Sequence, residues 1–251
     1  MFANENMKIY NKITIAKKAN KKSFALLIDP DKQNEKQLIT IIKKAKNANT
    51  DYLFVGGSLL TSDSLDFCLK TIKENSNIPT ILFPGNAMQV NNKADGILFL
   101  SLISGRNADM LIGKQVITAP ILKHSSLEVL PTGYMLIDSG KPTTVSYMSN
   151  TIPIPADKDT VAACTAMAGE MLGLKLIFMD GGSGAKIPIS EEMIKAVRES
   201  VNVPLIIGGG INSGEKAIAN CNAGADIIVV GNAIEKNDDL ISEIAHAVHG
   251  C

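Results

Sequence analysis

The sequence predicts an α/β fold: a closed (β/α)8 barrel of the TIM type with a parallel sheet, formed by residues 1–251 as a single domain. Eight short apolar runs recur along the chain, and helical patterns lie between them. Such a barrel takes about 250 residues, and the chain has 251. A doubly wound open sheet is the alternative architecture.

The eight apolar runs are the expected strands. They span residues 24–29, 52–56, 80–83, 96–100, 133–138, 174–180, 204–208 and 227–231. Each run is apolar on successive residues, which predicts that both faces of the strand are buried. This pattern is typical of a parallel sheet covered by helices.

Three helices are predicted from apolar residues spaced i, i+3, i+4, i+7. The three sets are Leu38, Ile41, Ile42 and Ala45; Val161, Cys164, Thr165 and Ala168; and Ile241, Ile244, Ala245 and Val248. A further helix is expected over 191–200, with Arg198 solvated. Residues 139–156 are expected to form a long irregular loop, because Pro142, Pro153 and Pro155 break helices there. A loop of that length typically covers or binds a ligand.

The composition excludes several classes of protein. The chain is 45% hydrophobic and balances 25 basic against 25 acidic residues, so it is not wholly disordered. With 7 Phe, 4 Tyr and no Trp, it offers few platforms for stacking bases, and no nucleic-acid partner is expected. The lysines concentrated in the first 50 residues fit a solvated helix face better than an anionic partner.

The chain is expected to be cytoplasmic. Its four cysteines lie far apart, which predicts small buried apolar side chains in a reduced compartment rather than disulfides or a zinc site. The first residues lack the apolar stretch of a signal peptide, and no apolar run reaches the roughly 18 residues of a membrane span.

Glycine, serine, asparagine and carboxylate residues follow the predicted strands repeatedly. These positions lie at the carboxyl ends of the strands, where the active sites of such barrels are found. Residues 208–210 after the seventh strand and Gly231-Asn232 after the eighth predict a phosphate site, because glycines let backbone amides approach an anion closely. The alternative is that these glycines only form tight turns. Residues 181–184 add a third glycine-rich edge.

Three acidic side chains are candidates for chemistry. Asp29 ends the first strand and, with Ser58 after the second, offers hard oxygen ligands for Mg²⁺. The alternative is that Asp29 caps the next helix, and Asp31 fits capping better than metal binding. Asp180 and Asp138 end strands too, and either could be a general base, a carboxylate that stabilises positive charge in a transition state, or a structural acceptor for a loop amide.

Eight strings resemble one enzyme family, in order from about residue 23 to 240. They are LLIDPDK, VGGSLL, LFPGN, LSLISGRN, GYMLIDSGK, FMDGGSGA, IIGGGI and VGN. Together they resemble the geranylgeranylglyceryl phosphate synthase family, most closely its longer-chain group with bacterial members. The resemblance implies a modified (β/α)8 barrel and an Mg²⁺-dependent prenyltransferase. The enzyme would join sn-glycerol 1-phosphate to a polyprenyl diphosphate, with geranylgeranyl diphosphate as the expected donor. The product would carry the first ether bond of an archaeal-type lipid.

The resemblance also implies the site residues. Asp29 and Ser58 would bind Mg²⁺, and Asp180 would be catalytic. The glycerol 1-phosphate site would comprise Phe178, Met179, Asp180, Gly181, Gly182, Ser183, Gly184, Gly209, Gly210, Gly231 and Asn232. The sequence departs from the family pattern at two places: Asp180 follows Phe-Met where Glu after Tyr-Leu is common, and Leu27 stands where some relatives have Lys.

The resemblance leaves the remaining partners as expectations. Residues 100–103 and 147–155 are expected to line an apolar groove for the prenyl chain. A homo-oligomer, dimer or hexamer, is expected, as is peripheral contact with a membrane for the lipid product. Two other functions stay open: another phosphate-binding barrel enzyme, an isomerase or lyase, and a non-catalytic phosphosugar-binding protein.

Overall fold

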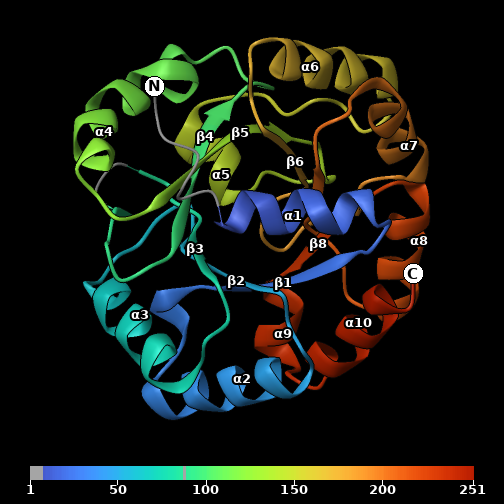
Figure 1. The fold of residues 1–251 in the computed structure, drawn as a ribbon. Helices are drawn as coiled ribbons and strands as arrows, with labels where there is room; N and C mark the ends of the chain where they lie inside the picture. Colours follow the sequence, from blue (N-terminus) through green and yellow to red (C-terminus); the bar gives the residue numbers. More distant parts are fainter. Residues whose placement is uncertain (1–7, 87–88) are drawn as a thin grey trace.

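The computed structural model describes residues 8–86 and 89–251, which form a closed parallel barrel (Figure 1). The strands pair in chain order, and β8 closes the barrel on β1, with Ser23 opposite Ile227. Their bounds are β1 Ser23–Ile28, β2 Tyr52–Val55, β3 Thr80–Leu82, β4 Gly96–Leu102, β5 Glu128–Leu136, β6 Leu176–Asp180, β7 Leu205–Gly208 and β8 Ile227–Val230. The predicted barrel is confirmed and the open sheet is wrong. All eight predicted strands are present, although β5 begins at Glu128 instead of residue 133.

Helices surround the barrel (Figure 1). Their bounds are α1 Lys8–Lys18, α2 Glu35–Asn47, α3 Ser64–Asn75, α4 Lys114–Lys123, α5 Thr144–Ser149, α6 Asp159–Met171, α7 Glu191–Ser200, α8 Gly214–Ala223, α9 Asn232–Lys236 and α10 Leu240–His249. Two shorter segments are the 3-10 helix η2 Pro30–Lys32 and the π-helix η4 Asp109–Gly113. Between β3 and β4 the described residues form turns instead of an α-helix, which departs from strict alternation.

The predicted helix faces are confirmed for α2 and α10 but wrong for α6. All four predicted residues of α2 and all four of α10 are buried. In α6, however, Val161 and Cys164 are exposed, whereas Ala162, Ala163, Ala166 and Gly169 face inward. The reason is close packing: a Cβ on Gly169 would lie 2.8 Å from Cδ1 of Ile103, so this face is built from small residues that carry a weak apolar signal.

Side chains on the inner face of the strands form a core separate from the layer between sheet and helices. The amino-terminal end of this inner core is closed by α1, which lies across the barrel in Figure 1 and buries Ile9 and Ile13. The carboxylate of Glu128, at the start of β5, accepts the amides of Ile9 and Tyr10 at 2.7 and 2.8 Å. Because the first amides of a helix have no partner within it, Glu128 anchors α1.

Three further expectations need correction. Arg198 is not solvated: its Nη1 lies 3.0 Å from Oδ2 of Asp226 and its side chain is 20% exposed, so it ties α7 to the start of β8. Of the four cysteines, Cys164 and Cys251 are exposed. The segment 139–156 is not wholly irregular, because α5 fits between its prolines with Thr143 as amino-terminal cap.

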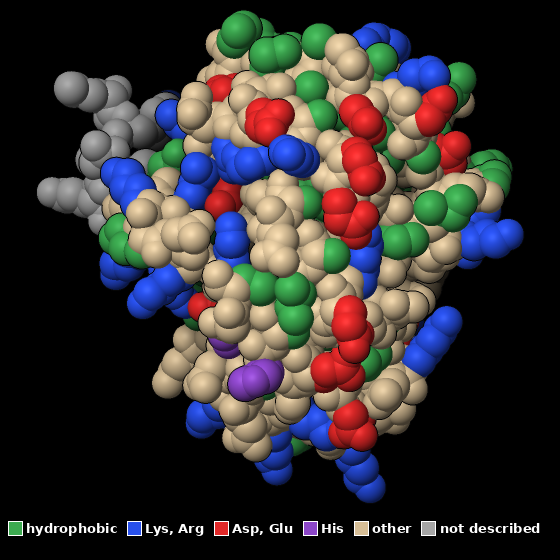
Figure 2. Space-filling model, turned by 90° about the vertical axis from the view of Figure 1, so that its right-hand side faces the viewer, with side chains coloured by type: hydrophobic (Ala, Val, Ile, Leu, Met, Phe, Trp, Pro, Cys, Tyr) green, Lys and Arg blue, Asp and Glu red, His purple; other side chains and the backbone are tan. Residues whose placement is uncertain are grey.

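The surface carries both signs of charge. Figure 2 shows the face at the right of Figure 1, where acidic and basic side chains lie side by side. Within the described ranges, none of the helices has the length and apolar content needed to cross a bilayer.

Candidate active site

A cavity of about 800 Å³ opens at the carboxyl ends of the strands. Eleven predicted site residues line it: Asp29, Ser58, Phe178, Asp180, Gly182, Ser183, Gly184, Gly209, Gly210, Gly231 and Asn232. The barrel therefore brings the candidate metal ligands, the candidate base and the three glycine-rich edges to one chamber. Met179 and Gly181 do not line it. Met179 packs in the layer between sheet and helices, and the Gly181 amide donates to the Gly208 carbonyl at 3.1 Å.

The glycine-rich edges pack against one another. Gly209 and Gly210 have φ of +85° and +76°, in the left-handed region that favours glycine. A Cβ on Gly209 would lie 2.6 Å from the Gly181 amide nitrogen, so the loop after β7 touches the loop after β6. In the described part of the chain, the amides of Gly209 and Gly210 donate to no protein acceptor. They remain available to an anion in the cavity.

Asp180 is buried at the end of β6 and has two partners. Its Oδ2 accepts the hydroxyl of Tyr134 at 2.6 Å, and its Oδ1 accepts the Gly182 amide at 2.8 Å. Burial raises the pKa of the Asp180 carboxyl above its usual range, although both hydrogen bonds oppose this. Burial and the neighbouring carboxylate also raise the pKa of Tyr134 well above 10. A buried carboxyl with a raised pKa suits a general base.

Aromatic rings form the floor of the cavity beneath Asp180. Phe83 stacks on Phe178 with ring centroids 5.2 Å apart, and Tyr134 meets Phe178 edge-on at 5.5 Å. Phe54 lies 6.4 Å from Phe83 and completes the cluster. Tyr134 therefore packs edge-on against both Phe83 and Phe178, and its hydroxyl donates to Asp180.

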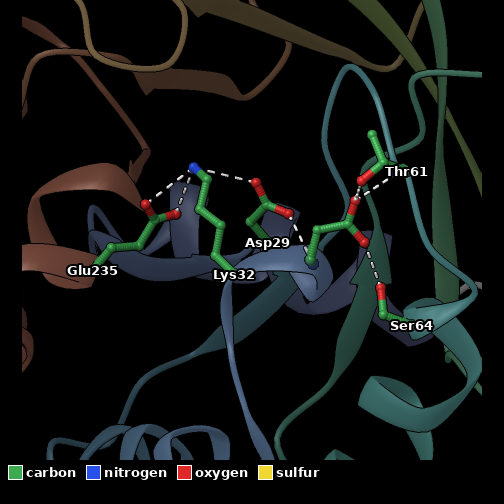
Figure 3. Close-up of polar contacts among 6 residues, drawn as sticks. Asp29, Lys32, Thr61, Ser64 and Glu235 are labelled. Carbon is green, nitrogen blue, oxygen red and sulfur yellow. Dashed lines mark hydrogen bonds and ion pairs between the residues drawn. The ribbon is translucent and has the colours of Figure 1, made fainter.

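The carboxylates after β1, Asp29 and Asp31, form a second polar cluster among the residues that line the cavity (Figure 3). Asp29 caps η2 through Oδ1, which accepts the Asp31 amide at 3.1 Å, while Oδ2 lies 3.2 Å from the Lys32 ammonium. The capping alternative for Asp29 is therefore correct for one of its oxygens. Asp31 accepts from the backbone and hydroxyl of Thr61 and from the hydroxyls of Ser62 and Ser64. These hydrogen bonds hold the pKa of Asp31 far below its usual range and fix the loop after β2.

The donor set fits a magnesium ion. In the described residues, no group of three or more His, Cys, Asp or Glu side chains gathers as a metal site, so an all-protein cage is not present there. Magnesium instead takes one or two protein oxygens together with phosphate oxygens and water. Asp29 and Ser58 would supply such oxygens: both line the cavity, and a Cβ on Gly57, the residue before Ser58, would lie 3.9 Å from Asp29 Oδ2. The Lys32 ammonium beside Oδ2 shows that this oxygen accepts a cation.

An apolar branch of the cavity extends toward α4 and α5. The lining residues there include Leu100, Leu102, Met110, Val145 and Met148. Within the ranges 100–103 and 147–155, Leu100, Leu102, Met148 and Ser149 line the cavity, whereas the side chains of Tyr147 and Ile152 are 84% and 86% exposed; a groove for the prenyl chain there stays a prediction.

Two other polar residues that follow strands, Asp138 and Arg106, do not line the cavity. Asp138 is exposed, and its Oδ1 accepts the Gly140 amide at 3.0 Å, which is the structural role left open for it. Arg106 donates to the Gly105 carbonyl at 2.8 Å and is not among the lining residues. Sequence reasoning missed Tyr134 and Glu235. Tyr134 lies inside an apolar run, and Glu235 has the appearance of an ordinary surface residue of a short helix.

The model of the PcrB family matches residues 16–248, almost the whole chain. The chain is a member of the PcrB family. Its relatives in this family include the geranylgeranylglyceryl phosphate synthase of Chitinophaga pinensis, 57% identical over 242 residues that cover 96% of both chains. The enzyme of that name from Methanosphaera stadtmanae is 38% identical and covers 97% of this chain and 100% of its own.

Solved structures agree with this PcrB family assignment. The crystal structure of (S)-3-O-geranylgeranylglyceryl phosphate synthase from Thermoplasma acidophilum, in complex with its substrate sn-glycerol-1-phosphate, matches with a TM-score of 0.92. It is 30% identical, and the match covers 98% of this chain and 100% of the other. The resemblance seen in the sequence is confirmed, bacterial relatives included.

Proposed function

We propose that this chain joins sn-glycerol 1-phosphate to a polyprenyl diphosphate, with geranylgeranyl diphosphate as the expected donor, and releases diphosphate. An ether bond forms between the 3-hydroxyl oxygen of the glycerol and C1 of the prenyl chain. The bond between C1 and the diphosphate oxygen breaks, and the hydroxyl proton passes to a base. The observation that carries the proposal is that one cavity is lined by Gly209 and Gly210, whose amides have no acceptor among the described residues, by the buried Asp180, by Asp29 and Ser58, and by apolar side chains.

The glycerol phosphate would bind at the glycine-rich edges. The amides of Gly209 and Gly210 would donate to the phosphate oxygens, with further support from Gly182 to Gly184 and from Gly231 and Asn232. Glycine at 209 keeps this approach open, because a side chain there would meet Gly181 and Asp180. The glycerol backbone then extends from the phosphate toward Asp180.

The prenyl diphosphate would bind across the other half of the cavity. Its chain would occupy the apolar branch beside Leu100 and Leu102, and its diphosphate would face Asp29 and Ser58. Mg²⁺ held by these two residues would neutralise charge on the departing diphosphate as a Lewis acid. The site residues, the bound Mg²⁺ and the dependence of the activity on Mg²⁺ are proposed together with the activity itself.

Asp180 would accept the proton of the attacking hydroxyl. It lies beside Gly182 and Gly209 of the glycine-rich loops, and burial makes its carboxylate more basic than an exposed one. Tyr134 would hold the carboxylate in place through Oδ2. The same carboxylate would stabilise positive charge that develops on the allylic carbon.

Mass spectrometry of the products tests this function. The enzyme is incubated with glycerol 1-phosphate, Mg²⁺ and prenyl diphosphates of C15 to C35, beside a sample containing EDTA and the Asp180→Asn variant. We expect an ether-linked prenylglyceryl phosphate, its loss in EDTA, and a decrease in rate of about 10²- to 10⁴-fold in the variant. A glycerol phosphate that binds but yields no ether product with any donor would support a non-catalytic binding protein instead.

A further inference from the structure

The ammonium of Lys32 lies between two carboxylates that come from opposite ends of the chain. Its Nζ is 3.2 Å from Oδ2 of Asp29, which follows β1, and 3.1 and 3.0 Å from the two carboxylate oxygens of Glu235 on α9 (Figure 3). These segments meet because β8 pairs with β1. All three side chains line the cavity.

The oxygen that Lys32 contacts is the one available for a metal ion. Oδ1 of Asp29 accepts the Asp31 amide and is fixed by the turn of η2. Oδ2 faces the cavity edge and lies near Gly57, beside Ser58. An ammonium and a divalent cation carry like charge and need the same oxygen, so close occupation by both is unfavourable.

Glu235 offers Lys32 a second position. The Glu235 side chain is 18% exposed, and both of its oxygens contact the ammonium. α9 begins directly after Gly231, so Glu235 stands close to the proposed phosphate loop. Without a cationic partner, a carboxylate at this position would repel phosphate groups. The Lys32 ammonium neutralises the charge of Glu235. A small rotation of the long lysine side chain leaves it on Glu235 and frees Asp29.

We propose that Lys32 is an internal competitor for the metal position: it occupies Oδ2 of Asp29 in the metal-free enzyme and is retained by Glu235 alone when a divalent cation binds. This inference rests on the proposed function in one respect, the assignment of Asp29 as a metal ligand. Lys32 is a positioning residue in this scheme. Its ammonium neutralises the Asp29 carboxylate in the metal-free enzyme. The strength of its ion pair with Glu235 determines how readily it leaves Asp29.

Binding of Mn²⁺ to the full chain without substrates, followed by electron paramagnetic resonance, tests the competition. Lys32→Met removes the competitor, so we expect Mn²⁺ to bind about threefold to tenfold more tightly, the scale of a partly exposed charge pair. Glu235→Gln leaves Lys32 on Asp29, and we expect weaker binding. The matched control is Lys36→Met on α2, which removes the same charge from an exposed position and should leave the affinity close to that of wild type.

A double-mutant cycle separates this role from a simple change in local charge. If Glu235 acts through Lys32, Glu235→Gln should weaken Mn²⁺ binding less in the Lys32→Met background than in wild type. Additive effects would overturn the proposal. So would Mn²⁺ binding by Lys32→Met that is unchanged or weaker than in wild type.

Thermal unfolding gives a second readout that does not depend on activity. Lys32→Met should have a lower melting temperature than wild type without metal, because both ion pairs are lost, and a larger gain on addition of Mg²⁺. An equal gain in the two proteins would contradict the competition. The Asp29→Asn variant separates the metal assignment from the competition. If Asp29→Asn binds Mn²⁺ as wild type does, the metal assignment fails and this inference fails with it. If Asp29→Asn loses Mn²⁺ binding while Lys32→Met binds Mn²⁺ as wild type does, only the competition is refuted.

Discussion

Replacing Gly209 by alanine should damage the site far more than the same change at Gly173. The two glycines have similar backbone conformations, with φ of +85° at Gly209 and +91° at Gly173. A left-handed alanine costs about 1–2 kcal/mol, so both variants carry this penalty. A Cβ on Gly173 meets nothing within 4 Å, and its cost should end there. Gly173→Ala is therefore the matched control.

At Gly209 the added methyl group meets the site itself. Its Cβ would lie 2.6 Å from the Gly181 nitrogen, 2.8 Å from the Gly181 Cα and 2.9 Å from Oδ1 of Asp180. These atoms must move by roughly half an ångström or more, and overpacking of this kind adds about 1–3 kcal/mol to the destabilisation. We expect a total of about 2–5 kcal/mol. Because a shift near 1 Å can cost about 10²-fold in rate, turnover should also fall by one to two orders of magnitude.

Urea unfolding and calorimetry measure the two effects separately. Urea curves give the free energy of unfolding of both variants, and titration with glycerol 1-phosphate gives affinity. The Gly173→Ala protein should bind the ligand as wild type does, whereas Gly209→Ala should bind it at least tenfold more weakly. Equal affinity in Gly209→Ala and wild type would refute the placement of the phosphate at this loop.

Three further changes test other parts of the account. Tyr134→Phe removes a hydrogen bond that lowers the pKa of Asp180, so that pKa should rise further. The acid limb of the pH profile of kcat should then move to higher pH. An unmoved limb would show that Tyr134 does not influence the pKa of the base. The pKa of Asp31 is depressed in the folded state, so the carboxylate stabilises the fold above the unfolded pKa of 3.8, and this stabilisation is lost as the pH falls below that value. Asp31→Asn should therefore lose less free energy of unfolding than wild type on acidification. Equal losses in the two proteins would contradict this. Glu128→Ala should lower the free energy of unfolding by about 1–3 kcal/mol through loss of the α1 anchor while kcat stays unchanged, since Glu128 lies at the far end of the barrel; a decrease in kcat would show that α1 influences the site.

Most of the site could be predicted because the fold is regular where the site lies. Parallel strands with both faces buried appear in the sequence as continuous apolar runs, and their carboxyl ends share one edge. Asp29, Asp180 and Gly209 each follow such a run, so their proximity follows from topology alone.

The partners of these residues could not be predicted in the same way. Tyr134 lies on β5 within an apolar run, and only the pairing of β5 with β6 places it next to Asp180. Glu235 depends on the closure of β8 on β1, and its spacing in sequence from Lys32 carries no signal. The α6 face was misjudged for a related reason: close helix packing selects small residues such as Gly169, which periodicity of large apolar residues does not reveal. Homo-oligomerisation and membrane contact stay predictions.

An isotope experiment tests the central claim, that the glycerol 3-hydroxyl attacks the prenyl carbon. Glycerol 1-phosphate labelled with ¹⁸O at the 3-hydroxyl is incubated with geranylgeranyl diphosphate and Mg²⁺, and the lipid and the inorganic product are analysed by mass spectrometry. The account predicts that the label is retained entirely in the ether oxygen of the lipid and that the released diphosphate is unlabelled. Label bonded to phosphorus, as phosphoryl transfer to the glycerol would give, or no transfer of the prenyl group at all, would contradict it.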